Sequence, residues 1–118
     1  MHTAATIAIA IVGLLHVYIL ILEMFLWTKP AGLRAFRLTP ERAEASKVLA
    51  ANQGLYNGFL AAGLFWSVLR ERGGGPIAIF FLTCVIIAGL YGAATANRKI
   101  LYVQALPAII ALVLVHLH

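Results

Sequence analysis

Long apolar stretches separated by short polar connections follow one another along the whole chain. Four of these stretches carry few or no charges and are each about 18 to 24 residues long, a length that crosses the hydrocarbon core of a bilayer as a helix. They cover residues 4–27, 48–69, 76–96 and 100–117. The pattern predicts an all-α, polytopic membrane protein with four transmembrane helices, folded as a single domain over residues 1–118.

The first polar connection, residues 28–47, ends in a typical helix start. Thr39 is a good N-cap, Pro40 fits the first helical position, and the Glu41 carboxylate faces the positive end of the helix dipole. We therefore expect the second membrane helix to begin near Pro40 and to protrude from the membrane by about two turns.

Basic residues gather in two of the three connections. Seven of the nine Lys and Arg residues lie there, and only Arg70 and Arg72 lie in the other connection. The seven are Lys29, Arg34, Arg37, Arg42, Lys47, Arg98 and Lys99. Because basic connections stay in the cytoplasm, we expect both termini outside and the protruding helix inside, in a multi-pass protein of the cell inner membrane. Topology thus explains the net charge of +5, and we do not expect a nucleic-acid partner.

The second helix has two faces of different character. Small residues recur every four positions on one face, at Ala50, Gly54, Gly58 and Ala62. Such a ladder lets another helix approach closely, so we expect a homo-oligomer, although a helix of the same subunit can also use it. Polar side chains fall within about 140° on the other face, and we expect them to line a polar region. They are Asn52, Gln53, Tyr56 and Asn57.

Polar residues of all four helices have similar predicted depths. The helical rise places one group about 6 to 10 Å below the cytoplasmic surface and His16 and Asn57 near 15 Å. The shallower group is Glu23, Asn52, Gln53, Tyr91 and Gln104. Because an ionisable side chain that faces lipid costs several kcal/mol, we expect Glu23 and His16 to point into the bundle. Pro107 is expected to bend the last helix beside Gln104.

Two interpretations of this polar layer remain open. It is either a hydrogen-bond network that fixes helix register or a ligand-binding or catalytic site in which Glu23 is the only carboxylate. The ligand-binding candidates are Glu23, His16, Asn52, Gln53, Tyr56, Asn57, Tyr91, Arg98 and Gln104. We expect no metal site, because His116 and His118 do not share a helix face, and the single Cys84 is expected to pack.

The string from Asn52 to Leu60, together with His16 and the segment from Glu23 to Trp27, resembles an uncharacterised family of small four-span bacterial membrane proteins, domain of unknown function 1304. This resemblance covers essentially the whole chain and implies the fold and the membrane location.

A remoter similarity, through Asn52 and Tyr56, is to the membrane-associated proteins in eicosanoid and glutathione metabolism, which are trimers of four-helix subunits. That similarity implies a glutathione-like thiol as cofactor, with Arg98 in the place of the arginine that stabilises the thiolate. Leu55 stands where that family has its acidic residue.

Three functions are compatible with these features, and they leave open whether the protein is an enzyme. The first is a site near the cytoplasmic face that binds a polar cofactor and a lipophilic substrate. The second is a non-catalytic assembly or lipid-binding subunit, with membrane lipids as partners. The third is a proton-coupled small-molecule exporter that uses Glu23 and resembles the small multidrug resistance transporters. The uneven distribution of basic residues counts against the third, because those transporters insert in both orientations.

Overall fold

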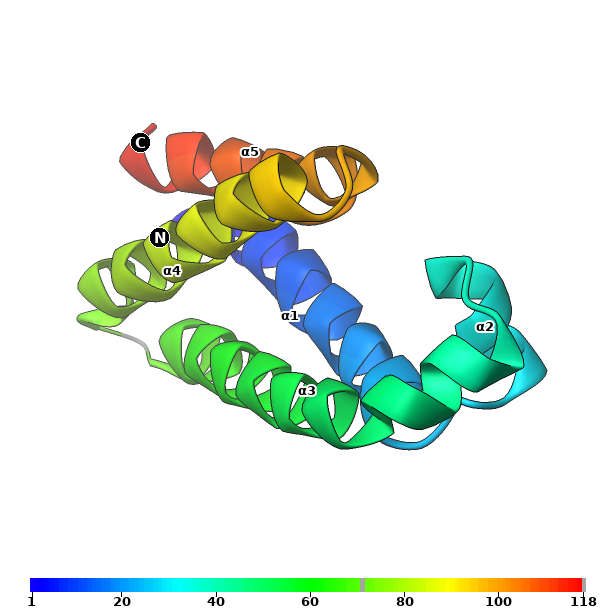
Figure 1. The fold of residues 1–118 in the computed structure, drawn as a ribbon. Coiled ribbons are helices and arrows are strands. Elements are labelled where there is room, and N and C mark those ends of the chain that lie inside the picture. Colours follow the sequence, from blue (N-terminus) through cyan, green and yellow to red (C-terminus); the bar gives the residue numbers. More distant parts are fainter. Residues whose placement is uncertain (71, 118) are drawn as a thin grey trace. The chain divides into compact units, whose positions relative to one another are not determined.

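Helices make up most of the chain in the computed structural model, which describes residues 1–70 and 72–117 (Figure 1). They are α1 (Thr3–Met24), α2 (Pro30–Phe36), α3 (Pro40–Leu69), α4 (Gly74–Thr95), the π-helical turn η1 (Leu101–Ala105) and α5 (Leu106–His116). Within the described residues there is no strand. The all-α prediction is confirmed.

The start of α3 is the one predicted from the sequence. The helix begins at Pro40, and the Thr39 Oγ1 accepts a hydrogen bond from the backbone N–H of Arg42 at 3.2 Å. Thr39 is therefore the N-cap, as expected from a Thr directly before Pro and Glu.

Two helices, α1 and α4, are long and apolar enough to cross a membrane. The apolar part of α3 is less hydrophobic because it contains two Asn residues and a Gln, and the last apolar stretch is divided between η1 and α5. Membrane-helix character is thus present in the structure, while four spans and their orientation stay predictions.

The chain divides into two compact units, and α1 and α3 contribute to both of them. The first unit consists of Met1–Leu14 and the chain from Leu60 onward, and the second of Leu15–Phe59. The core of the first unit is built from apolar side chains of α1, α3, α4 and α5. These are Ala5, Ile9, Val12, Leu64, Ala78, Leu82, Val85, Ala108, Ala111 and Val115.

Within the first unit, α4 and α5 lie side by side and antiparallel (Figure 1). Pro107 has no N–H to donate to Val103, and the turn before it widens, so that the Leu106 N–H bonds the Leu101 carbonyl. A Cβ built on Gly89 of α4 would lie 2.9 Å from the backbone nitrogen of Ala105. The backbone of the widened turn therefore packs directly against the backbone of α4. Only a glycine at position 89 leaves room for this contact.

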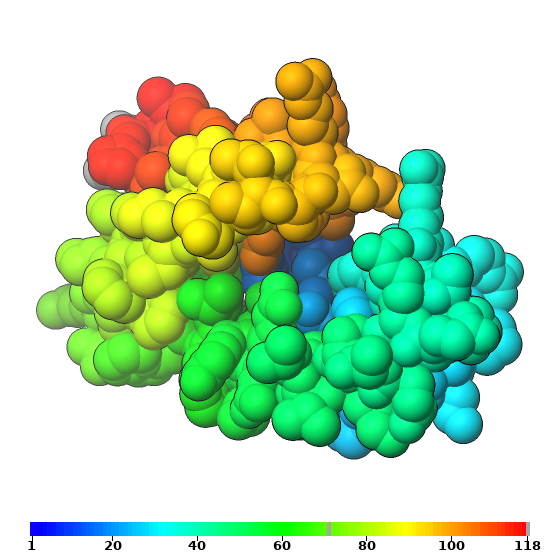
Figure 2. Space-filling view, in the orientation of Figure 1, coloured from blue at the N-terminus to red at the C-terminus, as the bar shows by residue number. Residues whose placement is uncertain are grey.

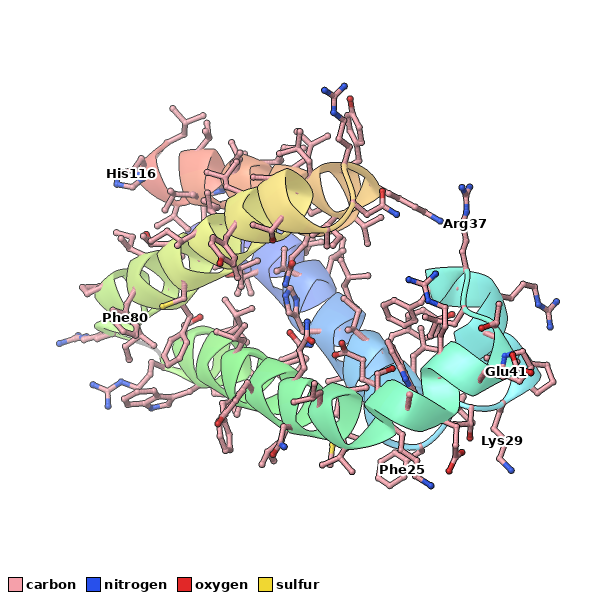
Figure 3. All side chains as sticks on the ribbon, in the orientation of Figure 1. Phe25, Lys29, Arg37, Glu41, Phe80 and His116 are labelled. Carbon is pink, nitrogen blue, oxygen red and sulfur yellow. The ribbon has the colours of Figure 1, made fainter. Side chains whose placement is uncertain are left out.

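Within the second unit, the connection between α1 and α3 folds back on itself. The Trp27 indole N–H donates to the Ser46 Oγ at 3.1 Å, and its ring packs on Phe36 with centroids 4.8 Å apart. Arg37 ends α2 in the left-handed region with φ of 54°, and its side chain points away from the helices in Figure 3. The hydrogen bond from Trp27 to Ser46 thus holds the beginning of this connection to α3.

The exposed face of α1 is apolar, unlike that of a helix on the surface of a soluble protein. Its exposed face carries large apolar side chains at intervals of three and four residues, Ile7, Ile11, Leu14, Tyr18 and Ile21, and Phe25 follows directly after the helix. Its buried face contains His16 and Glu23, which are 0% and 3% exposed. Phe25, directly after α1, and Phe80 of α4 point away from the helices in Figure 3. Figure 2 shows side chains of α3 (green) and α4 (yellow) on the surface.

We expect Gly89→Ala to lower the free energy of unfolding by about 1 to 3 kcal/mol, because the added methyl group meets backbone atoms of Ala105 that cannot turn aside. Thermal unfolding of the purified protein in detergent measures the change. Gly75→Ala is the matched control, since a Cβ there has no atom within 4 Å, and it should leave stability unchanged or slightly higher. Equal stability of the two variants would contradict the close approach of α4 and η1.

Candidate functional site

A hydrogen bond between two buried polar side chains joins α1 to α3 in the second unit. The Asn57 Nδ2 donates to the Glu23 Oε1 at 2.5 Å, and the two residues are 34 positions apart in the chain. Both are buried, with 3% of Glu23 and 8% of Asn57 exposed. The pair therefore links the last turn of α1 to the middle of α3.

Two glycines of α3 make this approach possible. A Cβ on Gly54 would lie 2.6 Å from the Met24 Cγ and 3.1 Å from the Glu23 Cβ, and a Cβ on Gly58 would lie 2.7 Å from the Leu20 Cδ1. A helix of the same subunit thus uses this part of the predicted small-residue ladder, as the sequence left open.

The far end of the predicted ladder differs from the structure. Ala62 is exposed, and Ala61 takes the buried position instead. An α-helix has 3.6 residues per turn, so a four-residue repeat moves about 40° around the helix at each step and leaves the packed face after three steps.

The predicted polar face of α3 divides between the interior and the surface. Asn57 is buried beside Gly54, while Asn52, Gln53 and Tyr56 are exposed. The Asn52 Nδ2 donates to the backbone carbonyl of Val48 in its own helix at 3.3 Å. An arc of about 140° is wider than the packed face, so its two edges meet different surroundings.

His16 lies on the buried face of α1 with Glu23, as their spacing predicted, and is fully buried. Across residues 1–70 and 72–117, no buried side-chain nitrogen or oxygen lacks a hydrogen-bond partner. Buried polar groups cost free energy unless they are paired, and here the pairing is complete in the part of the chain that is described.

The other candidate residues belong to the first unit. Tyr91 is exposed near the end of α4, Arg98 is exposed in the connection that follows, and Gln104 is half-buried in η1. The Asn97 Oδ1 accepts the backbone N–H of Lys99 at 2.9 Å and so orders that connection. It stays a prediction that these residues lie at a similar membrane depth to Glu23.

A shallow groove of about 460 Å³ lies in the second unit, at the end of α1 and along residues 47–55 of α3. It is termed the Lys47 groove and is lined by Met24, Lys47, Val48, Ala51, Asn52 and Leu55. Among these residues, only Asn52 belongs to the ligand-binding candidates predicted from the sequence. The missed signal is the spacing of Val48, Ala51 and Leu55, which places three apolar side chains on one helix face directly after a lysine.

A second hollow, of about 440 Å³, lies in the first unit and is bounded in part by His2, Arg70 and His116. Both imidazoles bond backbone carbonyls, His2 that of Leu114 at 2.7 Å and His116 that of Leu112 at 2.9 Å. No group of three His, Cys, Asp or Glu side chains suited to a metal ion occurs in the described part of the chain. The predicted relation of His116 to His118 involves a residue outside the described ones.

Comparisons with known proteins agree with the resemblance predicted from the sequence. The model of a family described as protein of unknown function (DUF1304) matches residues 10–116. The chain is also 35% identical, over 114 residues, to the uncharacterised protein YpaA of Lactococcus lactis subsp. lactis (strain IL1403), covering 94% of this chain and 96% of that protein. No solved structure matches. The predicted membership is confirmed, and the similarity to the glutathione and eicosanoid proteins stays a prediction.

We expect the single substitutions Glu23→Ala and Asn57→Ala, combined in a double-mutant cycle, to give a coupling energy of about 0.6 to 1.7 kcal/mol, the range found for hydrogen bonds between membrane helices. Unfolding by sodium dodecyl sulfate, followed by tryptophan fluorescence, measures it.

The control cycle pairs Glu23→Ala with Asn52→Ala. Asn52 is exposed and bonds within its own helix, so its coupling to Glu23 should be close to zero. Similar coupling in both cycles would show that the Glu23 to Asn57 bond contributes nothing specific.

Proposed function

Since the chain belongs to the DUF1304 family, whose function is unknown, we propose a role for it from its own geometry. The protein is a multi-pass integral protein of the cell inner membrane, and buried polar contacts between its helices hold it together. The observation that carries this proposal is the apolar outer face of α1, with His16 and Glu23 on its buried face.

An outer face made of large apolar side chains, with His16 and Glu23 kept on the buried face, suits a hydrocarbon solvent. In water, a large apolar side chain that stays fully exposed forgoes about 1.5 to 3 kcal/mol of burial free energy, and α1 alone leaves five such side chains exposed. In a bilayer these side chains contact lipid at no such cost, while His16 and Glu23 would be costly on the lipid side. Both sets of side chains therefore lie where a membrane favours them.

The proposed topology has four spans. α1 and α4 are two of them, the part of α3 after Lys47 is the third, and η1 with α5 is the fourth. The first and third connections contain seven of the nine basic residues, which supports a cytoplasmic position for them and an outer position for both termini.

The arrangement around Glu23 supports a non-catalytic assembly or lipid-binding role more than catalysis or export. A general base or a proton-coupled cation site must be reached by its substrate. Glu23 and Asn57 are bonded to each other and buried, and neither residue lines the two hollows described above. The Glu23 to Asn57 bond thus fits an interaction that sets the register of α1 on α3. A homo-oligomer remains part of the proposal.

Cysteine labelling tests the membrane topology. In a Cys84→Ser background, we expect Arg72→Cys to react with a membrane-impermeant maleimide on intact cells, because the second connection faces outward. Arg37→Cys should react only after the cells are opened, because the first connection faces the cytoplasm. Both positions are exposed in the structure, so orientation alone separates them.

Labelling of both variants in detergent serves as the control for thiol reactivity. Labelling of Arg37→Cys on intact cells would overturn the orientation. Release of the protein from membranes by alkaline carbonate would overturn the proposed membrane insertion itself.

A further inference from the structure

The Lys47 groove combines an apolar floor with polar groups at defined positions. Val48, Ala51 and Leu55 form the floor along α3, and Met24 of α1 lies at its side. Lys47 adds a cation and Asn52 adds an amide. This combination of groups matches a molecule with a charged head and an apolar tail.

Under the proposed topology, the groove runs from the cytoplasmic surface into the hydrocarbon. Lys47 directly precedes the apolar stretch of residues 48–69 and so lies at the membrane surface. Asn52 lies about 7.5 Å deeper and Leu55 about 12 Å deeper by helical rise. This step rests on the proposed function, since it requires the chain to be in a membrane.

We propose that the Lys47 groove binds one anionic phospholipid of the cytoplasmic leaflet. The Lys47 ammonium contacts the lipid phosphate, and one acyl chain lies along Val48, Ala51 and Leu55. The Asn52 amide, which lines the groove, donates one of its two hydrogens to the Val48 carbonyl and has the second for an ester oxygen of the lipid.

The electrostatics of the second unit favour an anionic headgroup. Residues 28–47 contain five basic and two acidic side chains, so this segment carries a charge of 5 − 2 = +3. Basic segments beside a membrane span attract anionic lipids. Lys47 also pairs with Glu44, but both side chains are more than half exposed, and such a pair is weak enough to exchange for a phosphate.

The headgroup, and not the tail, should decide which lipid is retained. An acyl chain in a bilayer is already surrounded by hydrocarbon, so the apolar floor supplies shape without a hydrophobic driving force. The proposal therefore predicts a preference for anionic over zwitterionic lipids with identical chains.

Native mass spectrometry of the full chain in detergent tests this preference with dioleoyl phosphatidylglycerol and dioleoyl phosphatidylcholine. We expect one retained phosphatidylglycerol and markedly less phosphatidylcholine. Lys47→Gln should lower phosphatidylglycerol affinity about fivefold, the contribution of one basic residue at a membrane surface. Lys29→Gln is the charge-matched control outside the groove and should lower the affinity much less, because it reduces the charge of the segment without removing the contact to the phosphate.

Two further variants separate the groove from a general loss of folding. Glu44→Gln removes the competing carboxylate and should raise phosphatidylglycerol affinity, a gain that a misfolded protein does not produce. Ala51→Leu fills the floor and should weaken retention of both lipids. An equal loss in Lys47→Gln and Lys29→Gln, or full retention in Ala51→Leu, would overturn the proposal.

Glycerol phosphate at millimolar concentration distinguishes a lipid from a free phosphate. We expect it not to displace phosphatidylglycerol, and complete displacement would make a soluble phosphate the occupant and overturn the lipid. Carbonate extraction keeps the two proposals apart. A protein that stays in the membrane fraction but shows no lipid preference refutes the groove alone, while a protein released by carbonate refutes the membrane function as well.

Discussion

The hydrogen bond between Glu23 and Asn57 is the interaction on which the second compact unit depends. A carboxylate and an amide buried separately in an apolar interior would each be costly, and together they satisfy one another. The bond requires α1 and α3 to approach closely, which Gly54 allows by leaving no side chain in the way of Met24 and Glu23. A polar contact thus joins two helices that have apolar side chains on their outer faces.

A second polar contact acts on the same pair of helices. The Trp27 indole bonds Ser46, just beyond the end of α1 and near the start of α3. The bonds 23 to 57 and 27 to 46 therefore connect the two helices at successive levels, in the order expected for an antiparallel hairpin. The Lys47 groove lies in the same unit, beside Met24 at the end of α1 and along residues 47–55 of α3.

The first unit is organised by a different constraint, the missing N–H of Pro107. Because this residue cannot donate to Val103, the preceding turn widens to a π-turn, and Gly89 lets α4 pack directly against it. No polar side chain is needed for that contact. One unit therefore depends on a side-chain hydrogen bond and the other on a close approach of backbones.

The helical class, the start of α3 and the family follow from the sequence alone. The Thr39-Pro40-Glu41 start and the shared face of His16 and Glu23 are local properties, and the structure agrees with them. Gly54 also belonged to the packing face that the sequence indicated.

Only the tertiary structure decided which polar residue of α3 bonds Glu23. Asn52, Gln53, Tyr56 and Asn57 fit one arc on a helical wheel, but Asn57 alone shares the packed face with Gly54. A helical wheel gives the direction of each side chain around one helix and says nothing about where the neighbouring helix lies. The π-turn at η1 and the Lys47 groove were decided in the same way, since each depends on where one segment ends against another.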